Sequence, residues 1–263
     1  MRLDNGFLVL SKIGCISVHW SRLIEGTPKT VTVSNEADGW HVAISCMDVP
    51  VQPLPSTGQE MDIDMGLESF ATLANGQHIC TPAYYRKAEA YLRRCQRRVA
   101  RHKKGSRRRR KAVALLATAH LHIRNQRRDF HHRQAAKLVQ AYDVIYHEDL
   151  RVRNLVLNHH LAKSTSDAGW SQFLAILTFK AVGAGKRVQA VNPTFTSQAC
   201  SGCGVIVSKG LSVRWHSCPD CGRSLHRDHN AALNILRLGQ IQEQSGLGYS
   251  LRTLTWPIWA SVV

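Results

Sequence analysis

The order of the expected elements predicts an α/β domain built around a mixed sheet. From residue 61 onward the sequence indicates three strands, then helices, a strand, a helix, a strand and a final helix. The strands alternate apolar and polar side chains, whereas the helices repeat apolar residues every three or four positions. This order suits a ribonuclease-H-like domain, in which a mixed sheet carries helices on both faces. A chain of 263 residues with 44% hydrophobic content is sufficient for such a core.

The first 55 residues predict a separate β-rich segment. Short β-prone runs cover 7–10, 15–20, 30–33 and 40–46. Asp38-Gly39 lies between the last two runs and favours a hairpin turn. Prolines 50, 53 and 55 then mark a linker to the α/β domain.

The first three strands of the domain are expected to form a meander over 61–80. They cover 61–65, 69–73 and 77–80, with turns at Gly66 and at Asn75-Gly76. Asp62 and Asp64 lie two residues apart on the first strand, so their side chains share one face of the sheet.

A basic helical hairpin is expected to interrupt the domain over 83–140. Apolar positions from Tyr84 to Val99 have helical spacing, Gly105-Ser106 breaks the pattern, and a second helix follows toward Leu138. The spacing of Tyr84, Tyr85 and Tyr91 favours core packing over base stacking.

The hairpin carries the whole excess charge of the chain. Nineteen Lys and Arg stand between residues 86 and 137 against two acidic residues, and the rest of the chain is neutral, so the net charge is +17. A solvated helical face does not need so much charge, and this density predicts binding to a polyanion, with DNA and RNA not distinguished. The predicted nucleic-acid-binding residues are Arg93, Arg94, Arg97, Arg98, Arg101, Lys103, Lys104, Arg107, Arg108, Arg109, Arg110 and Lys111, with the run 107–110 at the tip.

The second half of the domain continues with a strand over 142–146 that leads to Glu148. Asp167 is predicted to cap the helix that buries Trp170 and Leu177, and another strand covers 187–191. The last helix is expected from Asp228 to about residue 240, and the tail over 241–263 is assigned no structure.

Two Cys-x-x-Cys pairs predict a zinc site, which either contacts nucleic acid or only stabilises the fold. Cys200-Ser-Gly-Cys203 and Cys218-Pro-Asp-Cys221 are separated by fourteen residues, and each is followed directly by a glycine that permits a tight turn. The other four cysteines, Cys15, Cys46, Cys80 and Cys95, are scattered and are expected to pack as small apolar residues. The alternative for the pairs is buried free thiols, and the spacing favours zinc.

Three acidic residues far apart in the sequence are candidates for a common catalytic site. Asp64 lies on the first strand, Glu148 ends the fourth, and Asp228 starts the last helix. Carboxylates that converge in this way hold the two magnesium ions of phosphodiester hydrolysis, about 3.5–4 Å apart. We expect neither His147 nor His226 to be a metal ligand, and we expect Asn230 to be a cap or a support for the site.

The residues around these acids closely resemble the RuvC-like nuclease motifs of the TnpB family. This family comprises transposon-encoded RNA-guided nucleases of the OrfB type, related to type V CRISPR effectors. The resemblance covers roughly residues 30–238, with the motifs in the family's order. The stretches that carry it are 62–72, 146–154 and 227–235 around the three acids, 192–197, and Leu211-Ser-Val-Arg-Trp-His216 within the cysteine region.

The resemblance implies that Asp64, Glu148 and Asp228 hold catalytic magnesium or manganese and that the four paired cysteines hold zinc. It also implies a guide RNA along the basic hairpin and an opened DNA strand in the nuclease cleft. The sequence departs from the family at Asp62, where glycine is common, so a second carboxylate either perturbs the metal site or faces solvent. Compared with the family, the chain is expected to lack most of the N-terminal recognition region, as a fragment, a decayed copy or a short form.

The function expected from the sequence is that of an RNA-guided DNA endonuclease of a mobile element. Two alternatives stay open: a truncated relative that binds nucleic acid without cutting it, and a DNA transposase that uses the same acids. No run of about 18 apolar residues is present, and neither disulfides nor a secretory segment is indicated, so we expect a prokaryotic cytoplasmic, nucleoid-associated protein. The oligomeric state is not indicated. The expected domains are a β-rich wedge remnant (1–55), a RuvC-like domain (56–195 and 226–240) with its basic insertion (83–140), a zinc ribbon (196–225) and a tail (241–263).

Overall fold

The computed structural model describes residues 2–4, 7–11, 13–21, 23–210, 213–245 and 260–261. Leu211 and Ser212 of the family-like stretch, and most of the tail, lie outside the described residues. The chain divides into two units. The first takes its described residues from 1–51, 94–121 and 251–263, and the second from 52–93 and 122–250.

The first unit contains two small antiparallel sheets. One has the order β1-β2-β3, and the other has the order β13-β5-β4. The turn expected at Asp38-Gly39 joins β4 and β5, where Glu36 pairs with Gly39. The strands are β1 (Arg2–Asp4), β2 (Phe7–Leu10), β3 (Gly14–Ser17), β4 (Thr27–Glu36), β5 (Gly39–Met47) and β13 (Ala260–Ser261).

The second unit is built on a five-stranded mixed sheet with the order β10-β9-β6-β7-β8. Strands β6, β9 and β10 are parallel, whereas β7 and β8 continue as the antiparallel meander that the sequence predicts. The strands are β6 (Glu60–Asp64), β7 (Ser69–Leu73), β8 (His78–Cys80), β9 (Val144–Glu148) and β10 (Arg187–Val191).

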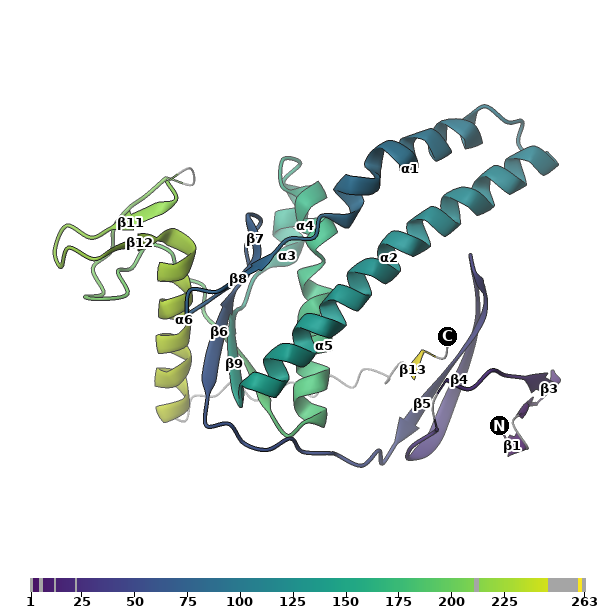
Figure 1. Cartoon of the computed structure of the whole chain (residues 1–263), viewed down its shortest axis with the longest axis horizontal. Helices are drawn as coiled ribbons and strands as arrows, with labels where there is room; N and C mark the ends of the chain where they lie inside the picture. The colour runs from purple at the N-terminus through teal and green to yellow at the C-terminus, as the bar shows by residue number, and fades with distance from the viewer. Residues whose placement is uncertain are drawn as a thin grey trace. The chain divides into compact units, whose positions relative to one another are not determined.

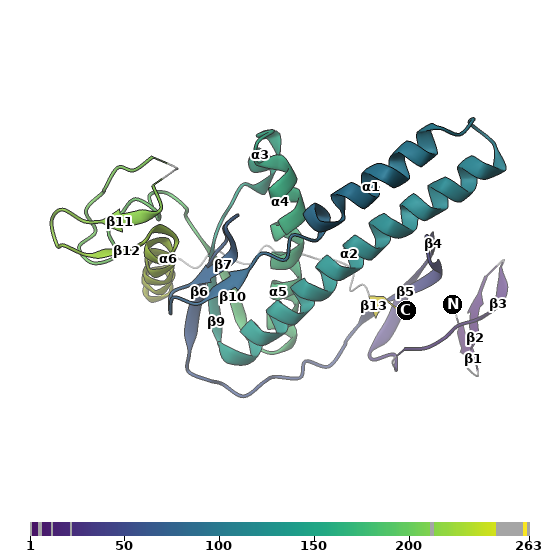
Figure 2. The ribbon, with the colours of Figure 1, turned by 45° about the horizontal axis from the view of Figure 1, so that its top comes forward.

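Helices cover both faces of this sheet. Helix α6 (Arg227–Gln244) lies against one face, and α5 (Trp170–Gly183) and the second half of α2 (Arg107–Ala141) lie against the other (Figures 1 and 2). The α2–α5 face holds the main core, including Ile63, Phe70 and Phe173, and the α6 face holds a smaller core around Tyr146 and Ile235. The expected α/β architecture is therefore confirmed.

The helical hairpin consists of α1 (Tyr84–Ala100) and α2, and its predicted break is confirmed. Gly105 has φ +82°, a conformation that favours glycine, and the Ser106 hydroxyl accepts a hydrogen bond from Arg109 N at 3.2 Å. The prediction for Tyr91 was wrong: this side chain is exposed, and Leu92 is buried in its place. The reason is that the buried stripe of α1 follows Leu92 and Cys95, three residues apart.

The prediction for Asp167 was also wrong. It lies inside α4 (Ala162–Ala168), and its carboxylate accepts hydrogen bonds from the backbone N–H groups of Tyr85, at 3.0 Å, and Arg86, at 3.3 Å. Asp167 therefore caps α1, from about 80 residues further along the chain. Helix α5 begins instead after Gly169, whose φ is +66°, without a side-chain cap.

Candidate metal centre and nucleic-acid interface

The parallel strands bring two of the predicted acids to one edge of the sheet. Asp64 ends β6 and Glu148 ends the adjacent strand β9, and the pairing of Ile63 with His147 sets them side by side. The carboxyl ends of parallel strands are a common position for ligand sites in α/β folds. Both side chains lie on the sheet face that α6 covers, since side chains alternate along a strand and Tyr146 packs against α6.

Asp228 reaches the same edge from the first turn of α6. A Cβ placed on Gly66, two residues beyond Asp64, would lie 3.9 Å from Asp228 Oδ2. The next residue, His229, fixes the start of the helix to the turn after β7, with its Nε2 2.9 Å from the Ala74 carbonyl oxygen. The structure therefore brings the three predicted acids to one place.

Burial and mutual repulsion raise the pKa values of the acids at this edge. The pKa of Asp64 is well above its usual value because of burial and then the charges of Glu148, Asp228 and Asp62, with Arg227 opposing them. Burial also raises the pKa of Glu148, against a hydrogen bond that its carboxylate accepts from the Thr196 hydroxyl. A divalent cation bound at such a cluster would lower these pKa values, because its positive charge favours the ionised carboxylates.

Asp62 is a further acid of this cluster, and it does not face solvent. Its side chain is fully buried, its Oδ1 accepts a hydrogen bond from Ala74 N at 2.9 Å, and its Oδ2 has no partner among the described residues. Burial raises the pKa of Asp62 to about 8, with the Ala74 N–H opposing the shift and the charge of Glu148 adding to it. The alternative of a solvent-facing Asp62 was therefore wrong, because α6 covers this face of β6.

A second group at the edge was not predicted from the sequence. Glu68, His226 and Asp228 offer ligand atoms that all lie within 4.8 Å of one another. His226 Nδ1 lies 3.4 Å from Asp228 N, from which it accepts a hydrogen bond, and 3.9 Å from Asp228 Oδ2. Among the described residues, Asp64 and Glu148 do not join Asp228 in a group this tight. Glu68 follows Gly66 in the loop after β6, and no local pattern sets it apart from other surface acids.

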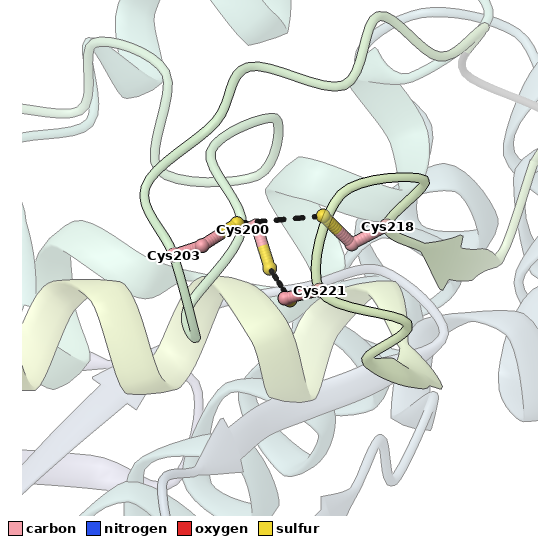
Figure 3. Close-up of side chains that lie close together, drawn as sticks. All are labelled: Cys200, Cys203, Cys218 and Cys221. Atoms are coloured by element: carbon pink, nitrogen blue, oxygen red, sulfur yellow. Dashed lines mark hydrogen bonds between the residues drawn. The ribbon is translucent and has the colours of Figure 1, made fainter.

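The four paired cysteines converge in the ribbon, as Figure 3 shows. The Sγ atoms of Cys200 and Cys221 are 3.6 Å apart, and those of Cys203 and Cys218 are 3.5 Å apart. Tetrahedral zinc with bonds of about 2.3 Å places its sulfur ligands about 3.8 Å apart, so the donor set and its spacing fit zinc.

Both knuckles of the ribbon fold in the same way. Cys200 N donates to Val205 O at 2.9 Å, and Cys218 N donates to Arg223 O at 2.9 Å. The following glycines, Gly204 at φ +83° and Gly222 at φ +71°, close the turns that the sequence predicts. A hairpin of β11 (Trp215–Ser217) and β12 (Ser224–His226) then leads directly into α6.

Two asparagines of α6 attach the ribbon to the acidic edge. Asn230 is fully buried; its Oδ1 accepts from Ser201 N at 2.9 Å, and its Nδ2 donates to Ala199 O at 2.7 Å. Asn234 Nδ2 donates to Thr196 O and to Ala199 O, both at 2.8 Å. The segment 196–201 therefore contacts Glu148 through the Thr196 hydroxyl, carries Cys200, and is held by the helix that presents Asp228. Asn230 is thus a support, as expected.

The basic residues of the hairpin tip are mostly exposed. Of the twelve predicted contacts, only Arg109 is partly buried. Its guanidinium donates to Val99 O at 2.9 Å and to His102 O at 3.4 Å, which closes the hairpin. Arg93 pairs with Glu89 at 2.9 Å on the same helix. No helix in the described part of the chain is long and apolar enough to cross a membrane.

The architecture and the site define an α/β protein with an acidic sheet edge and a four-cysteine ribbon, and comparisons with known proteins identify its relatives. The family OrfB_IS605, described as "Probable transposase", matches residues 32–159. The family "Cas12f1-like, TNB domain" matches residues 170–235, which include the ribbon.

Named relatives agree with both matches. A Streptomyces pristinaespiralis protein named "Putative RNA-guided DNA endonuclease" is 39% identical over 250 residues, covering 93% of this chain and 62% of the relative. A protein of Escherichia coli K12, "Putative RNA-guided DNA endonuclease InsQ", is 29% identical, covering 90% of this chain and 63% of the relative. These matches confirm the resemblance drawn from the motifs: the chain is a relative of the TnpB family. It spans less than two thirds of the length of these relatives.

One solved structure supports the fold. A CRISPR-Cas12f ternary complex superposes with a TM-score of 0.54 at 19% identity, covering 78% of this chain and 44% of the solved one. The α/β fold therefore resembles that of Cas12f.

Proposed function

We propose that the chain is the RuvC-like, ribonuclease-H-like nuclease part of a transposon-associated RNA-guided DNA endonuclease. The observation that carries this proposal is the acidic sheet edge: Asp64, Glu148 and Asp228 come from three separate elements, and burial together with the charges of Glu148 and Asp228 raises the pKa of Asp64. Clusters of carboxylates with raised pKa values at the ends of strands are typical of functional sites. The names of the relatives supply the reaction class, DNA cleavage guided by RNA.

Asp64, Glu148 and Asp228 would hold two magnesium or manganese ions. Such ions supply activation of the attacking water and stabilisation of the leaving oxygen in phosphodiester hydrolysis. When two ions lie about 4 Å apart and each metal–oxygen bond is about 2.1 Å, ligand oxygens on opposite sides of the pair lie up to about 8 Å apart. Three acids that are too far apart to bind a single ion together are therefore compatible with this assignment. The Thr196 hydroxyl would orient the Glu148 carboxylate, and the capped start of α6 would orient Asp228.

Zinc bound by Cys200, Cys203, Cys218 and Cys221 would hold the ribbon against α6. In this proposal the four thiolates are structural ligands, since their tetrahedral set leaves no open position. The division of the chain would be a β-rich part at 1–55, a nuclease domain at 56–195 and 226–240 with the insertion at 83–140, and the ribbon at 196–225.

Guide RNA and DNA are the proposed partners, and the charge distribution favours a nucleic acid without distinguishing the two. The exposed Arg and Lys residues of the hairpin, from 93 to 111, would contact phosphates, because a phosphate backbone complements a dense basic surface at any sequence. The opened DNA strand would lie at the acidic edge, where the scissile phosphate meets Asp64.

Cleavage of a labelled DNA single strand by the full chain tests the proposal. Cleavage should require magnesium or manganese, and Asp64→Ala or Asp228→Ala should reduce it by more than about 100-fold. Asp149→Asn is the matched control, since Asp149 is exposed directly beside Glu148 and should leave the rate unchanged. Equal rates for the wild type and Asp64→Ala would reject the assignment.

A transposase is a second candidate, favoured by the description of the family that matches residues 32–159. A transposase would join the cut strand to a target in addition to cleaving it. Incubation with labelled transposon ends separates the two candidates, because an endonuclease gives only cleaved products. Tight binding without cleavage by either the wild type or Asp228→Ala would instead support a non-cleaving binding protein.

A further inference from the structure

An exposed indole stands at the point where the ribbon meets α6. Trp215, on the short strand β11, is 55% exposed, although it is one of the largest apolar side chains of the second unit. Its Nε1 donates a hydrogen bond to Ser224 Oγ at 2.6 Å across the hairpin, and Ser224 Oγ also lies 3.3 Å from Ser217 Oγ. The ring is therefore held in place while much of its surface faces water.

Two imidazoles continue from this indole toward the sheet. Trp215 pairs with His226 across the β11–β12 hairpin, with ring centroids 6.4 Å apart and planes at 82°. His226 contacts His78 of β8 with centroids 6.1 Å apart and planes at 88°. Edge-to-face contacts of this kind hold neighbouring rings in place although the rings are not stacked on one another. Trp215, His226 and His78 together are called the aromatic row below.

The aromatic row ends at the acidic edge and is flanked by arginines. His226 Nδ1 lies 3.9 Å from Asp228 Oδ2. Arg214 precedes Trp215, with 57% of its side chain exposed, and pairs with Glu68 at 3.5 Å. Arg227 follows His226, and its guanidinium donates to Gly210 O at 2.8 Å. A strand held at Asp228 thus has cations for its phosphates and rings for its bases at the same place.

We propose that the aromatic row is a base-stacking platform for the single-stranded nucleic acid that enters the Asp228 site. The inference rests on the proposed function, since it takes Asp228 as the place where the strand is held. Bases inside a duplex are stacked on each other, so only a single strand offers free base faces to an indole. Stacking on an indole tolerates any base, which suits an enzyme whose target sequence is read by a guide.

Binding of fluorescein-labelled single-stranded DNA to the zinc-loaded full chain, without magnesium, tests the platform by anisotropy. Trp215→Ala should weaken binding about 5- to 150-fold, since one stacked base contributes about 1–3 kcal/mol. Trp215→Phe should restore most of the affinity. Trp40→Ala is the matched control: Trp40 is 72% exposed on β5 of the first unit, and its loss should change nothing.

A strand of abasic sugars separates stacking from phosphate contact. The wild type should bind this strand more weakly than the normal one, and Trp215→Ala should bind it as the wild type does. A loss in Trp215→Ala that persists on the abasic strand would overturn the platform, as would equal binding of the normal strand by both proteins. Equal binding would leave Trp215 as a surface for a protein partner.

The outcome does not depend on the nuclease assignment. Binding is measured without cleavage. If the normal strand and the abasic strand both give the expected results, the stacking platform is supported even if the wild type cuts no DNA. Magnesium-dependent cleavage together with unchanged binding by Trp215→Ala would reject the platform alone.

Discussion

Removal of the Asn234 side-chain amide tests the attachment of the ribbon to α6. Asn234 is buried, and its Nδ2 donates to the carbonyl oxygens of Thr196 and Ala199, both at 2.8 Å. Asn234→Ala removes both hydrogen bonds. The Thr196 carbonyl oxygen then has no donor among the described residues, at about 1–2 kcal/mol, whereas Ala199 O keeps its hydrogen bond from Asn230 Nδ2 at 2.7 Å, so the second loss is about 0.5–1 kcal/mol. The better helix propensity of alanine returns about 0.5 kcal/mol. The free energy of unfolding should therefore fall by about 1–2.5 kcal/mol.

Urea denaturation of the zinc-loaded chain, followed by circular dichroism, measures this loss. Gln240→Ala is the control on the same helix: Gln240 is exposed, its amide donates to Glu60 at 3.0 Å, and its loss should cost less than about 0.5 kcal/mol. If Asn234→Ala loses no more stability than Gln240→Ala, the two hydrogen bonds do not hold the ribbon.

The same variant measures the energetic coupling between the ribbon and the helix. In the wild type, a zinc chelator should destabilise both, because Cys200 lies in the segment that Asn234 holds. In Asn234→Ala the chelator should lower the free energy of unfolding by less than it does in the wild type. The difference between the two losses should be about 0.5–3 kcal/mol, which is the usual coupling between groups in contact. Strictly additive losses would show that the ribbon and α6 unfold independently.

The remaining predictions concern pH, orientation of Glu148, and zinc. Burial among aromatic rings lowers the pKa of His131 to about 4, so its folded form resists protonation and stability falls as pH drops from about 6.5 toward 4. At pH 5 this group lowers the free energy of unfolding by about 2 kcal/mol. The stability difference between pH 7.5 and pH 5 should therefore be about 2 kcal/mol smaller in His131→Leu than in the wild type, and an equal difference in the two proteins would contradict the lowered pKa. Thr196→Val should reduce magnesium affinity or cleavage about 10- to 100-fold, with Thr196→Ser retaining both, because the hydroxyl bonded to Glu148 is lost only in valine; equal rates for the two variants would exclude an orienting role. A zinc chelator should lower the melting temperature more than replacement of residues 107–110 by alanine does, and an unchanged melt in chelator would reject zinc as a structural ligand.

Local patterns in the sequence were sufficient for the five strands of the central sheet, the helical hairpin and the ribbon turns, but not for α4. The β7–β8 meander, the break at Gly105-Ser106 and both cysteine knuckles depend on residues close together in the chain, so their signals are complete within a few positions. The approach of Asp64, Glu148 and Asp228 was expected from the family motifs. The structure gives the reason why the three acids approach one another: the parallel strands β6 and β9 end side by side, and α6 begins at the same edge of the sheet.

Contacts between distant segments had no such signal. Asp167 caps a helix about 80 residues before it, and as a short acid near a helix start it resembled a local cap. The sequence left Asp62 either at the metal site or facing solvent, and only the packing of α6 on that face of β6 showed that it is buried.

The sequence by itself determined the α/β class, the four-cysteine set, the basic hairpin and the family relationship, because each depends on motifs, residue spacing or charge along the chain. Only the tertiary structure decided that Asn230 and Asn234 hold the ribbon, that Thr196 bonds to Glu148, and that Trp215, His226 and His78 form a row ending at Asp228. Each of these depends on packing between elements that are remote in sequence. A buried donor must find an acceptor within about 3 Å wherever the fold places one.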